Sequence, residues 1–260
     1  MSESKVVFVG AGPGDPDLIT VKGKKILDQA DVVVYAGSLV NRELLAGLKE
    51  GAECFDSASL TLDEAVAIMV PAARAGKKVV RLHTGDPSLY GAIQEQMEAL
   101  QAHQVDYEVV PGVTAAFAAA ASIRQELTLP GVSQTVILTR IEGRTPVPEK
   151  EKLAKIAAIG ATTCLYLSVG MIDKVVSELL AGAYSEQTPV AVVSRASWDD
   201  EMIVEGTLAD IAAKVKAAGL TRQALIIVGE SLAARSRGLR EKSKLYDASF
   251  AHGFRTGKEE

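Results

Sequence analysis

The stretch Val79–Gly91, VVRLHTGDPSLYG, decides how the rest of the chain is interpreted. An apolar run, Val79–Leu82, is followed after two residues by a Gly-Asp-Pro turn at 85–87. Aspartate is a favoured N-cap residue and proline suits the first helical position, so the stretch predicts a strand, a tight turn and a helix. In open α/β sheets, ligands bind at such turns, outside the carboxyl ends of the strands. The stretch therefore predicts a binding site.

The start of the chain repeats this arrangement. Val6–Val9 is followed by GAGPGDPD at 10–17. A dinucleotide fold would need G-x-G-x-x-G and, about twenty residues on, an acidic residue for the ribose. Here Asp15 takes the place of the third glycine, and Tyr35-Ala36-Gly37 ends the next strand without a carboxylate. Asp15 would also compete with a phosphate for the N–H groups of the turn. The loop thus argues against a dinucleotide, although either loop alone is also compatible with a simple tight turn.

Composition limits the class of protein. The 260 residues, 48% of them hydrophobic, suffice for one large domain or two small ones. A net charge of −5 disfavours nucleic acid as the main partner. The N-terminal sequence lacks an apolar signal segment, and no apolar run approaches the ~18 residues of a membrane span, which predicts a cytoplasmic protein that does not bind a membrane. Histidines and cysteines show no metal-ligand spacing, so no metal site is predicted.

Strands and helices alternate along the first half of the chain. Five strands are expected at Val6–Val9, Val32–Tyr35, Glu53–Asp56, Val79–Leu82 and Tyr107–Val110. Helical patterns lie between them near Val21–Gln29, Asn41–Leu48, Leu62–Ala73 and Leu89–Ala102. This alternation is typical of βαβ units in a mainly parallel sheet. Pro111-Gly112 ends the pattern. The expected domains are therefore an N-terminal α/β domain, residues 1–112, and a C-terminal α/β domain, residues 113–260, with an extended tail.

The second half predicts a mixed sheet. An Ala-rich helix capped by Thr114 is expected to run to about Gln125. Strands are expected at Thr135–Leu138, Thr163–Leu167, Val190–Ser194, Ile203–Glu205 and Ala224–Val228. Helices are expected at Glu149–Ala158, Ile172–Leu180 and Leu208–Ala217. Two consecutive strands flank Asp199-Asp200, which favours a hairpin and hence antiparallel pairing.

Turns that are closed by their own aspartates suit a ligand without phosphates. S-adenosylmethionine has an adenosine that contacts apolar walls and backbone groups, and a sulfonium charge that tolerates nearby carboxylate or carbonyl oxygens. The loops alone do not choose between this cofactor and others.

Three motifs, in this order and spacing, resemble those of the tetrapyrrole methylase family: GAGPGDPD at 10–17, TGDPSLYG at 84–91 and PGVTA at 111–115. The resemblance covers essentially the whole chain and implies two α/β domains with S-adenosylmethionine between them. Further stretches are similar to the branch that methylates C11 of precorrin-4 or cobalt-precorrin-4 in cobalamin synthesis. These are YAGSLV at 35–40, ELTLPGVSQTVILTR at 126–140, EGRTPVP at 142–148 and SKLYDASFAHGFR at 243–255. The resemblance also implies a homodimer.

The resemblance implies cofactor contacts at the positions that match the family's motifs. They are Pro13, Thr84, Gly85, Asp86, Leu89, Tyr90, Thr114, Ala115, Leu167 and Ala196. S-adenosylhomocysteine would be the product left at the site. A precorrin carries acetates and propionates, and arginine pairs bidentately with carboxylates, so Arg140 and Arg144 are candidate substrate contacts. His83 is a third candidate. Each has a purely structural role as its alternative. No catalytic acid or base is predicted.

Other functions stay open at this point. A sibling tetrapyrrole methyltransferase would act on uroporphyrinogen III or precorrin-3B, and a panel of substrates would identify it. A nicotinamide-dependent dehydrogenase would bind NAD tightly without binding S-adenosylhomocysteine. A non-catalytic tetrapyrrole- or nucleoside-binding module would bind its ligand and transfer no methyl group.

Overall fold

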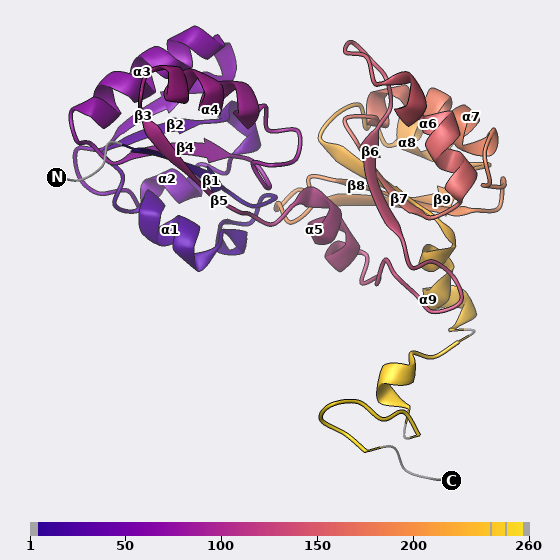
Figure 1. The fold of residues 1–260 in the computed structure, drawn as a ribbon. Helices are drawn as coiled ribbons and strands as arrows, with labels where there is room; N and C mark the ends of the chain where they lie inside the picture. Colours follow the sequence, from indigo (N-terminus) through magenta and orange to yellow (C-terminus); the bar gives the residue numbers. More distant parts are fainter. Residues whose placement is uncertain (1–4, 240, 248, 257–260) are drawn as a thin grey trace. The chain divides into compact units, whose positions relative to one another are not determined.

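The computed structural model describes residues 5–239, 241–247 and 249–256 (Figure 1). The chain divides into two compact units. Unit 1 comprises Met1–Ala118 and Arg195–Glu201, and unit 2 comprises Ala119–Ser194 and Met202–Glu260. The return of the chain to unit 1 over residues 195–201 was not predicted from the sequence. The domain boundary expected between residues 112 and 113 stays a prediction.

Unit 1 contains a five-stranded parallel sheet in the order β3-β2-β4-β1-β5. The strands are β1 (Lys5–Gly10), β2 (Val32–Tyr35), β3 (Glu53–Asp56), β4 (Val79–His83) and β5 (Asp106–Val110). All five expected strands and their parallel pairing are confirmed. The inner strands β2 and β4 are buried along their whole length, as expected for a parallel sheet that is covered on both faces.

Helices cover both faces of this sheet (Figure 1). Helices α1 (Val21–Leu27) and α2 (Glu43–Ala46) pack Leu27 and Leu44 against one face. Helices α3 (Leu62–Arg74) and α4 (Ile93–Ala102) cover the other face. Because side chains alternate along a strand, the residues of β1 and β4 contribute in turn to the two cores.

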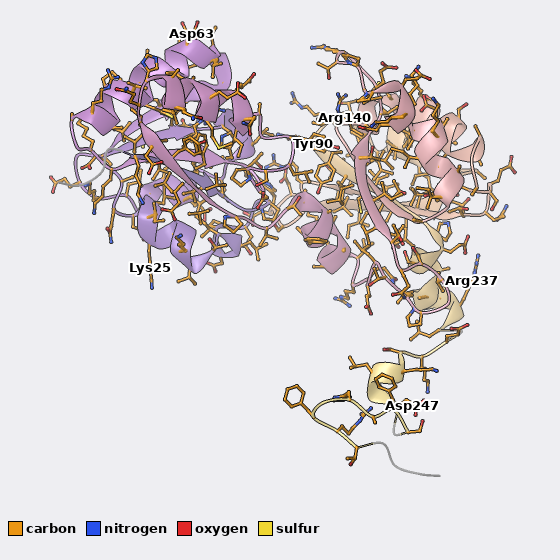
Figure 2. All side chains as sticks on the ribbon, in the orientation of Figure 1. Lys25, Asp63, Tyr90, Arg140, Arg237 and Asp247 are labelled. Carbon is orange, nitrogen blue, oxygen red and sulfur yellow. The ribbon has the colours of Figure 1, made fainter. Side chains whose placement is uncertain are left out.

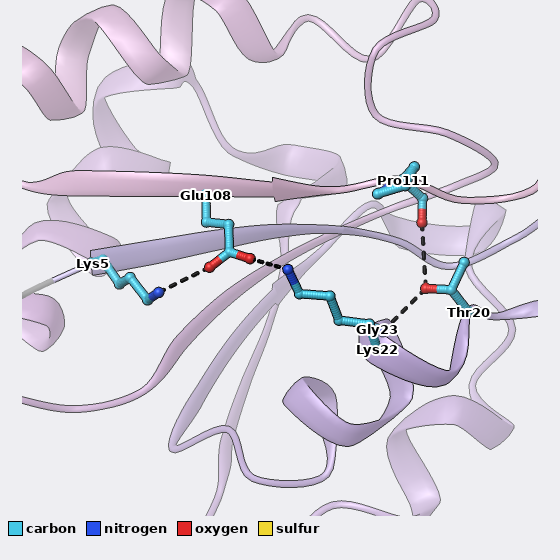
Figure 3. Close-up of polar contacts among 6 residues, drawn as sticks. All are labelled: Lys5, Thr20, Lys22, Gly23, Glu108 and Pro111. Carbon is cyan, nitrogen blue, oxygen red and sulfur yellow. Dashed lines mark hydrogen bonds and ion pairs between the residues drawn. The ribbon is translucent and has the colours of Figure 1, made fainter.

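Helix α1 begins at the predicted residue because Thr20 caps it. The Thr20 hydroxyl accepts a hydrogen bond from the Gly23 amide at 3.1 Å and donates one to the Pro111 carbonyl at 3.4 Å (Figure 3). Beside it, the Glu108 carboxylate binds both Lys22 and Lys5, the latter at 2.9 Å. The hydrogen bond from Lys22, and to a smaller extent the one from Lys5, lowers the pKa of Glu108 to about 2. These contacts join β1, β5 and α1.

Unit 2 contains a five-stranded sheet in the order β6-β7-β10-β8-β9. Its strands are β6 (Val136–Arg140), β7 (Thr162–Tyr166), β8 (Pro189–Ser194), β9 (Met202–Thr207) and β10 (Ala224–Val228). Strands β6 and β7 are parallel and the other pairs are antiparallel, so the mixed sheet and the β8–β9 hairpin are confirmed. One core of unit 2 combines this sheet with α6 (Leu153–Ile156), α7 (Ile172–Leu180) and α8 (Ile211–Ala217).

The remaining helices are short. Helix α5 (Ala115–Ser122) follows β5 and α9 (Ala234–Arg237) follows β10. Single 3₁₀ turns occur at Pro16–Leu18, Gly37–Leu39, Ser57–Ser59, Glu149–Glu151, Ala157–Ile159, Val169–Met171, Glu230–Ala233 and Lys244–Tyr246. Two of these turns flank α6, so the helix expected at Glu149–Ala158 is α-helical only in its middle. Among the described residues, no helix is long and apolar enough to span a bilayer.

Candidate functional site

The topology of unit 1 places a switch point between β4 and β1. These strands are neighbours in the sheet, yet α1, which follows β1, and α4, which follows β4, pack on opposite faces. In open α/β sheets, ligands bind outside the carboxyl ends of two neighbouring strands whose following helices lie on opposite faces of the sheet. The two Gly-Asp-Pro turns both lie here, since one follows β1 and the other follows β4.

Backbone hydrogen bonds join these two loops. The Gly85 amide donates to the Gly12 carbonyl at 2.7 Å, and the Gly12 amide donates to the Gly85 carbonyl at 3.3 Å. The loop after β5 lies against both of them, because a Cβ on Gly10 would come within 2.6 Å of the Gly112 Cα and 2.7 Å of the Gly85 carbonyl oxygen. Three loops therefore meet through residues that have no side chain.

Asp86 connects the loop after β4 to the loop after β5 by hydrogen bonds. One of its carboxylate oxygens accepts from the Ser88 amide at 2.8 Å, and the other accepts from the Gly112 amide at 2.9 Å. The expectation that Asp86 and Pro87 begin a helix is wrong, because α4 begins only at Ile93. Residues 87–90 form a turn instead, and Tyr90 and Ala92 both have left-handed backbone conformations. The helix predicted near Leu89–Ala102 is thus shorter by its first turn.

Asp15 closes the first loop locally, as the sequence predicted. Its side chain accepts from the Asp17 amide at 2.9 Å and caps the 3₁₀ turn Pro16–Leu18. The same loop also has partners that the sequence analysis missed. The Asp15 amide donates to the Ser197 hydroxyl at 3.0 Å, and the indole N–H of Trp198 donates to the Pro13 carbonyl at 2.9 Å. Ala196, an expected cofactor contact, is buried in this segment.

Two buried basic side chains lie on β4 beneath the loops. The Arg81 guanidinium donates to Gln96 at 2.9 Å and to the Val34 carbonyl at 3.1 Å, and burial lowers its pKa to about 10. His83 stacks on Phe8 with 6.1 Å between the ring centroids, and its Nε2 has no hydrogen-bond partner. Burial and the Arg81 charge lower the pKa of His83 to about 3, so its ring is neutral at pH 7. Its contact with substrate stays a prediction.

Three of the expected site residues, Arg140, Arg144 and Leu167, lie in unit 2. Leu167 follows β7 in a left-handed conformation with 71% of its surface exposed. Arg140, labelled at the end of β6 in Figure 2, donates to the Thr145 carbonyl at 3.2 Å and to the Pro146 carbonyl at 2.7 Å. Its guanidinium thus holds its own loop together, while Arg144 in that loop is exposed. Among the described residues, no group of three His, Cys, Asp or Glu side chains could hold a metal ion.

The residues present fit S-adenosylmethionine better than a phosphate-bearing cofactor. The three loops, 10–17, 84–91 and 111–115, contain aspartates but no lysine or arginine. A phosphate would meet carboxylates there and no basic side chain of these loops, whereas a sulfonium cation would be tolerated. The loop after β4 exposes 45% of the surface of Tyr90, labelled in Figure 2. Such an aromatic surface is suited to contact an adenosine.

Comparisons with known proteins agree with this chemistry. A model of the family described as Tetrapyrrole (Corrin/Porphyrin) Methylases matches residues 5–212. The chain is 59% identical over 251 residues to a cobalt-precorrin-4 C(11)-methyltransferase of Methanocaldococcus jannaschii. The aligned residues make up 96% of each chain. It is also similar to the X-ray structure of a cobalamin biosynthetic enzyme, a cobalt-precorrin-4 methyltransferase. That match has a TM-score of 0.86 and 53% identity, over 88% of this chain and 96% of the other.

A third match concerns a ligand-bound structure. The uroporphyrin-III C-methyltransferase of Thermus thermophilus, complexed with S-adenosylhomocysteine, gives a TM-score of 0.73. The two sequences are 31% identical, and the match covers 88% of this chain and 99% of the other. The similarity is thus lower than that to the solved cobalt-precorrin-4 methyltransferase, but it covers the same share of the chain.

Proposed function

The chain belongs to the tetrapyrrole methylase family, and on this premise we propose that it transfers a methyl group from S-adenosylmethionine to C11 of precorrin-4 or cobalt-precorrin-4. The observation that carries this conclusion is the 59% identity, along 96% of both chains, to an enzyme of that activity. The sibling uroporphyrin-III enzyme is 31% identical. This difference supports methylation at C11 over a sibling activity.

The loops of unit 1 supply binding and orientation. S-adenosylmethionine, when bound, would supply a methyl group that the substrate carbon attacks in line, with the positively charged sulfur as the leaving group. A partly reduced tetrapyrrole is electron-rich, so the chain's own task is to align the two reactants and to exclude water. Asp86, with both carboxylate oxygens bound to backbone amides, keeps the second and third loops in one arrangement for this purpose.

The proposed cofactor contacts are those that the family's motifs imply. They are Pro13, Thr84, Gly85, Asp86, Leu89, Tyr90, Thr114, Ala115, Leu167 and Ala196. Backbone strain supports several of them. Tyr90 and Leu167 have φ values of 56° and 53°, and Ala196 lies between two further residues with positive φ. Non-glycine residues persist in this conformation where their surroundings fix them, and they cluster at ligand-binding sites.

The substrate side of the proposal rests on charge. The substrate's acetate and propionate groups need cationic partners, and arginine is the residue best suited to them. Arg144 is exposed, whereas Arg140 already donates to carbonyls of its own loop. Arg144 is therefore the better candidate of the two. Contact of His83 with substrate, a homodimer and a cytoplasmic location all stay predictions.

The experiment that tests the reaction uses S-adenosylmethionine with an isotopically labelled methyl group. The enzyme is offered uroporphyrinogen III, precorrin-3B, precorrin-4 and cobalt-precorrin-4 in turn, and NMR locates the labelled carbon. We expect label at C11 of one or both forms of precorrin-4. Label at another ring carbon would assign a sibling activity, and no transfer to any substrate would refute the proposal.

A pair of variants in unit 2 tests the proposed cofactor site. Leu167 and Ile159 are both large apolar side chains with most of their surface exposed, 71% and 65% respectively. We expect Leu167→Ala to weaken the binding of S-adenosylhomocysteine about tenfold, because about 1.5 kcal/mol of apolar contact is lost. Ile159→Ala should leave binding unchanged. Equal affinities of the two variants, measured by calorimetry, would remove Leu167 from the site.

A further inference from the structure

The segment 195–201 leaves unit 2 between β8 and β9 and belongs to unit 1 by its contacts. It touches unit 1 at the first glycine loop. Trp198 donates its indole N–H to the Pro13 carbonyl at 2.9 Å, and Ser197 accepts the Asp15 amide at 3.0 Å. These two contacts lie on either side of Gly14.

Gly14 itself lies directly against the indole. A Cβ at this position would be 2.2 Å from Cδ1 and 2.3 Å from Nε1 of Trp198, far inside van der Waals contact. Its carbonyl accepts from the Asn41 side chain at 3.1 Å. The loop is therefore held between an asparagine that follows β2 and a tryptophan that comes much later in the chain.

The segment is also rigid in its own right. The Trp198 amide donates to the Arg195 carbonyl at 3.0 Å, the Ser197 amide donates to the Glu201 carboxylate at 2.7 Å, and the Arg195 guanidinium lies 4.1 Å from the centroid of the Trp198 ring. Arg195 and Ser197 have φ values of 49° and 68°, so two non-glycine residues are held in a left-handed conformation. Such strain persists only where the surrounding contacts fix it, and strained residues of this kind cluster at functional sites.

We propose that Trp198 is a positioning residue for the cofactor, because it holds the Pro13–Gly14 backbone in the shape that binds S-adenosylmethionine. The proposal rests on the proposed function, which places Pro13 and Ala196 beside the cofactor. Trp198 itself takes no part in the methyl transfer. It fixes one wall of the site, so its loss weakens cofactor binding and leaves the chemical step at saturating cofactor nearly unchanged.

The first test is Trp198→Phe, which keeps an aromatic ring beside Gly14 and removes only the N–H donor. Loss of one hydrogen bond should raise the Kd for S-adenosylhomocysteine and the KM for S-adenosylmethionine about fivefold, while kcat changes less than about twofold. Lys25→Ala, an exposed position on α1 (Figure 2), is the control and should match the wild type. A Trp198→Phe variant with wild-type Kd and KM, or with only a lower melting temperature, would overturn the inference.

A double-mutant cycle gives an independent test. Gly14→Ala should weaken S-adenosylhomocysteine binding about tenfold or more, because its methyl group collides with the indole. In a Trp198→Ala background the same change should cost less than about twofold, since the collision is gone. Equal costs in both backgrounds would overturn the inference. If the wild type binds S-adenosylhomocysteine but the cycle shows no coupling between the two positions, only the role of Trp198 is refuted. If the wild type does not bind S-adenosylhomocysteine, the proposed function is refuted as well.

Discussion

His83 should make the stability of unit 1 depend on pH in one direction. Its ring is buried against Phe8, and burial together with the Arg81 charge lowers its pKa from 6.5 to about 3. Below pH 6.5 the unfolded chain takes up a proton on this ring, whereas the folded chain does not until about pH 3. The unfolded state binds more protons in this window, so stability is complete above pH 6.5 and declines as the pH falls towards 3.

The size of the effect follows from the shift in pKa. Each pH unit inside the window costs about 1.4 kcal/mol, so the wild type should lose about 2 kcal/mol at this residue between pH 6.5 and pH 5. His83→Phe keeps a ring against Phe8 and removes both the titration and the unpaired Nε2. We therefore expect the free energy of unfolding of the variant, relative to the wild type, to rise by about 2 kcal/mol between pH 7 and pH 5.

Urea unfolding at pH 7, 6 and 5 measures this difference. Trp198 is the chain's single tryptophan and belongs to unit 1, so its fluorescence reports on the unit that contains His83. His103→Gln, at an exposed position after α4, serves as the control and should follow the wild type at every pH. If the wild type and His83→Phe lose stability in parallel as the pH falls, burial does not keep His83 neutral and the reasoning fails.

Three further predictions concern stability. Glu108→Gln should lower the free energy of unfolding by up to about 1 kcal/mol at pH 7, and this loss should vanish as the pH falls from 4.5 to about 2. The reason is that the lowered pKa of Glu108 stabilises the fold only above that window. A loss that persists at pH 2, measured by urea unfolding, would contradict this. Thr61→Ala, which breaks the capping box of α3, should cost about 1 kcal/mol in chemical unfolding, while Thr61→Ser should be nearly neutral. Leu165→Ala at a fully buried position in β7 should cost about 2–5 kcal/mol by circular dichroism, and a loss below about 1 kcal/mol would mean that this core is loosely packed.

The strands were predictable because their signals are local. Runs such as Val32–Tyr35 and Ala224–Val228 combine β-branched residues with flanking turns, and the structure has them with the same bounds. The start of α1 was equally local, since Thr20 caps the helix that follows it directly. The start of α4 at Ile93, later than the expected Leu89, was not predictable in this way. The Asp-Pro rule assumes that Asp86 serves the next helix, but one of its oxygens binds Gly112, 26 residues further on.

The candidate site shows the same division between local and distant signals. The glycine loops and the capping role of Asp15 follow from short motifs. The contact between Trp198 and Pro13 joins residues 185 positions apart, and nothing in the sequence around Trp198 indicates it. Arg140 is an intermediate case. The two prolines of GRTPVP have no N–H, so that loop offers carbonyls with few donors of its own, and this signal favours an arginine that serves the loop.

The late position of Trp198 in the chain has a consequence for biosynthesis. Domains tend to fold from the N-terminus while the ribosome is still elongating the chain, and all five strands of the unit 1 sheet have been made once Val110 has emerged. The indole that holds Pro13 is added only after 185 further residues have followed that proline. A nascent or prematurely terminated chain can thus form the sheet of unit 1 without its complete glycine loop. On the proposed function, such a chain should bind the methyl donor more weakly than a chain that contains Trp198.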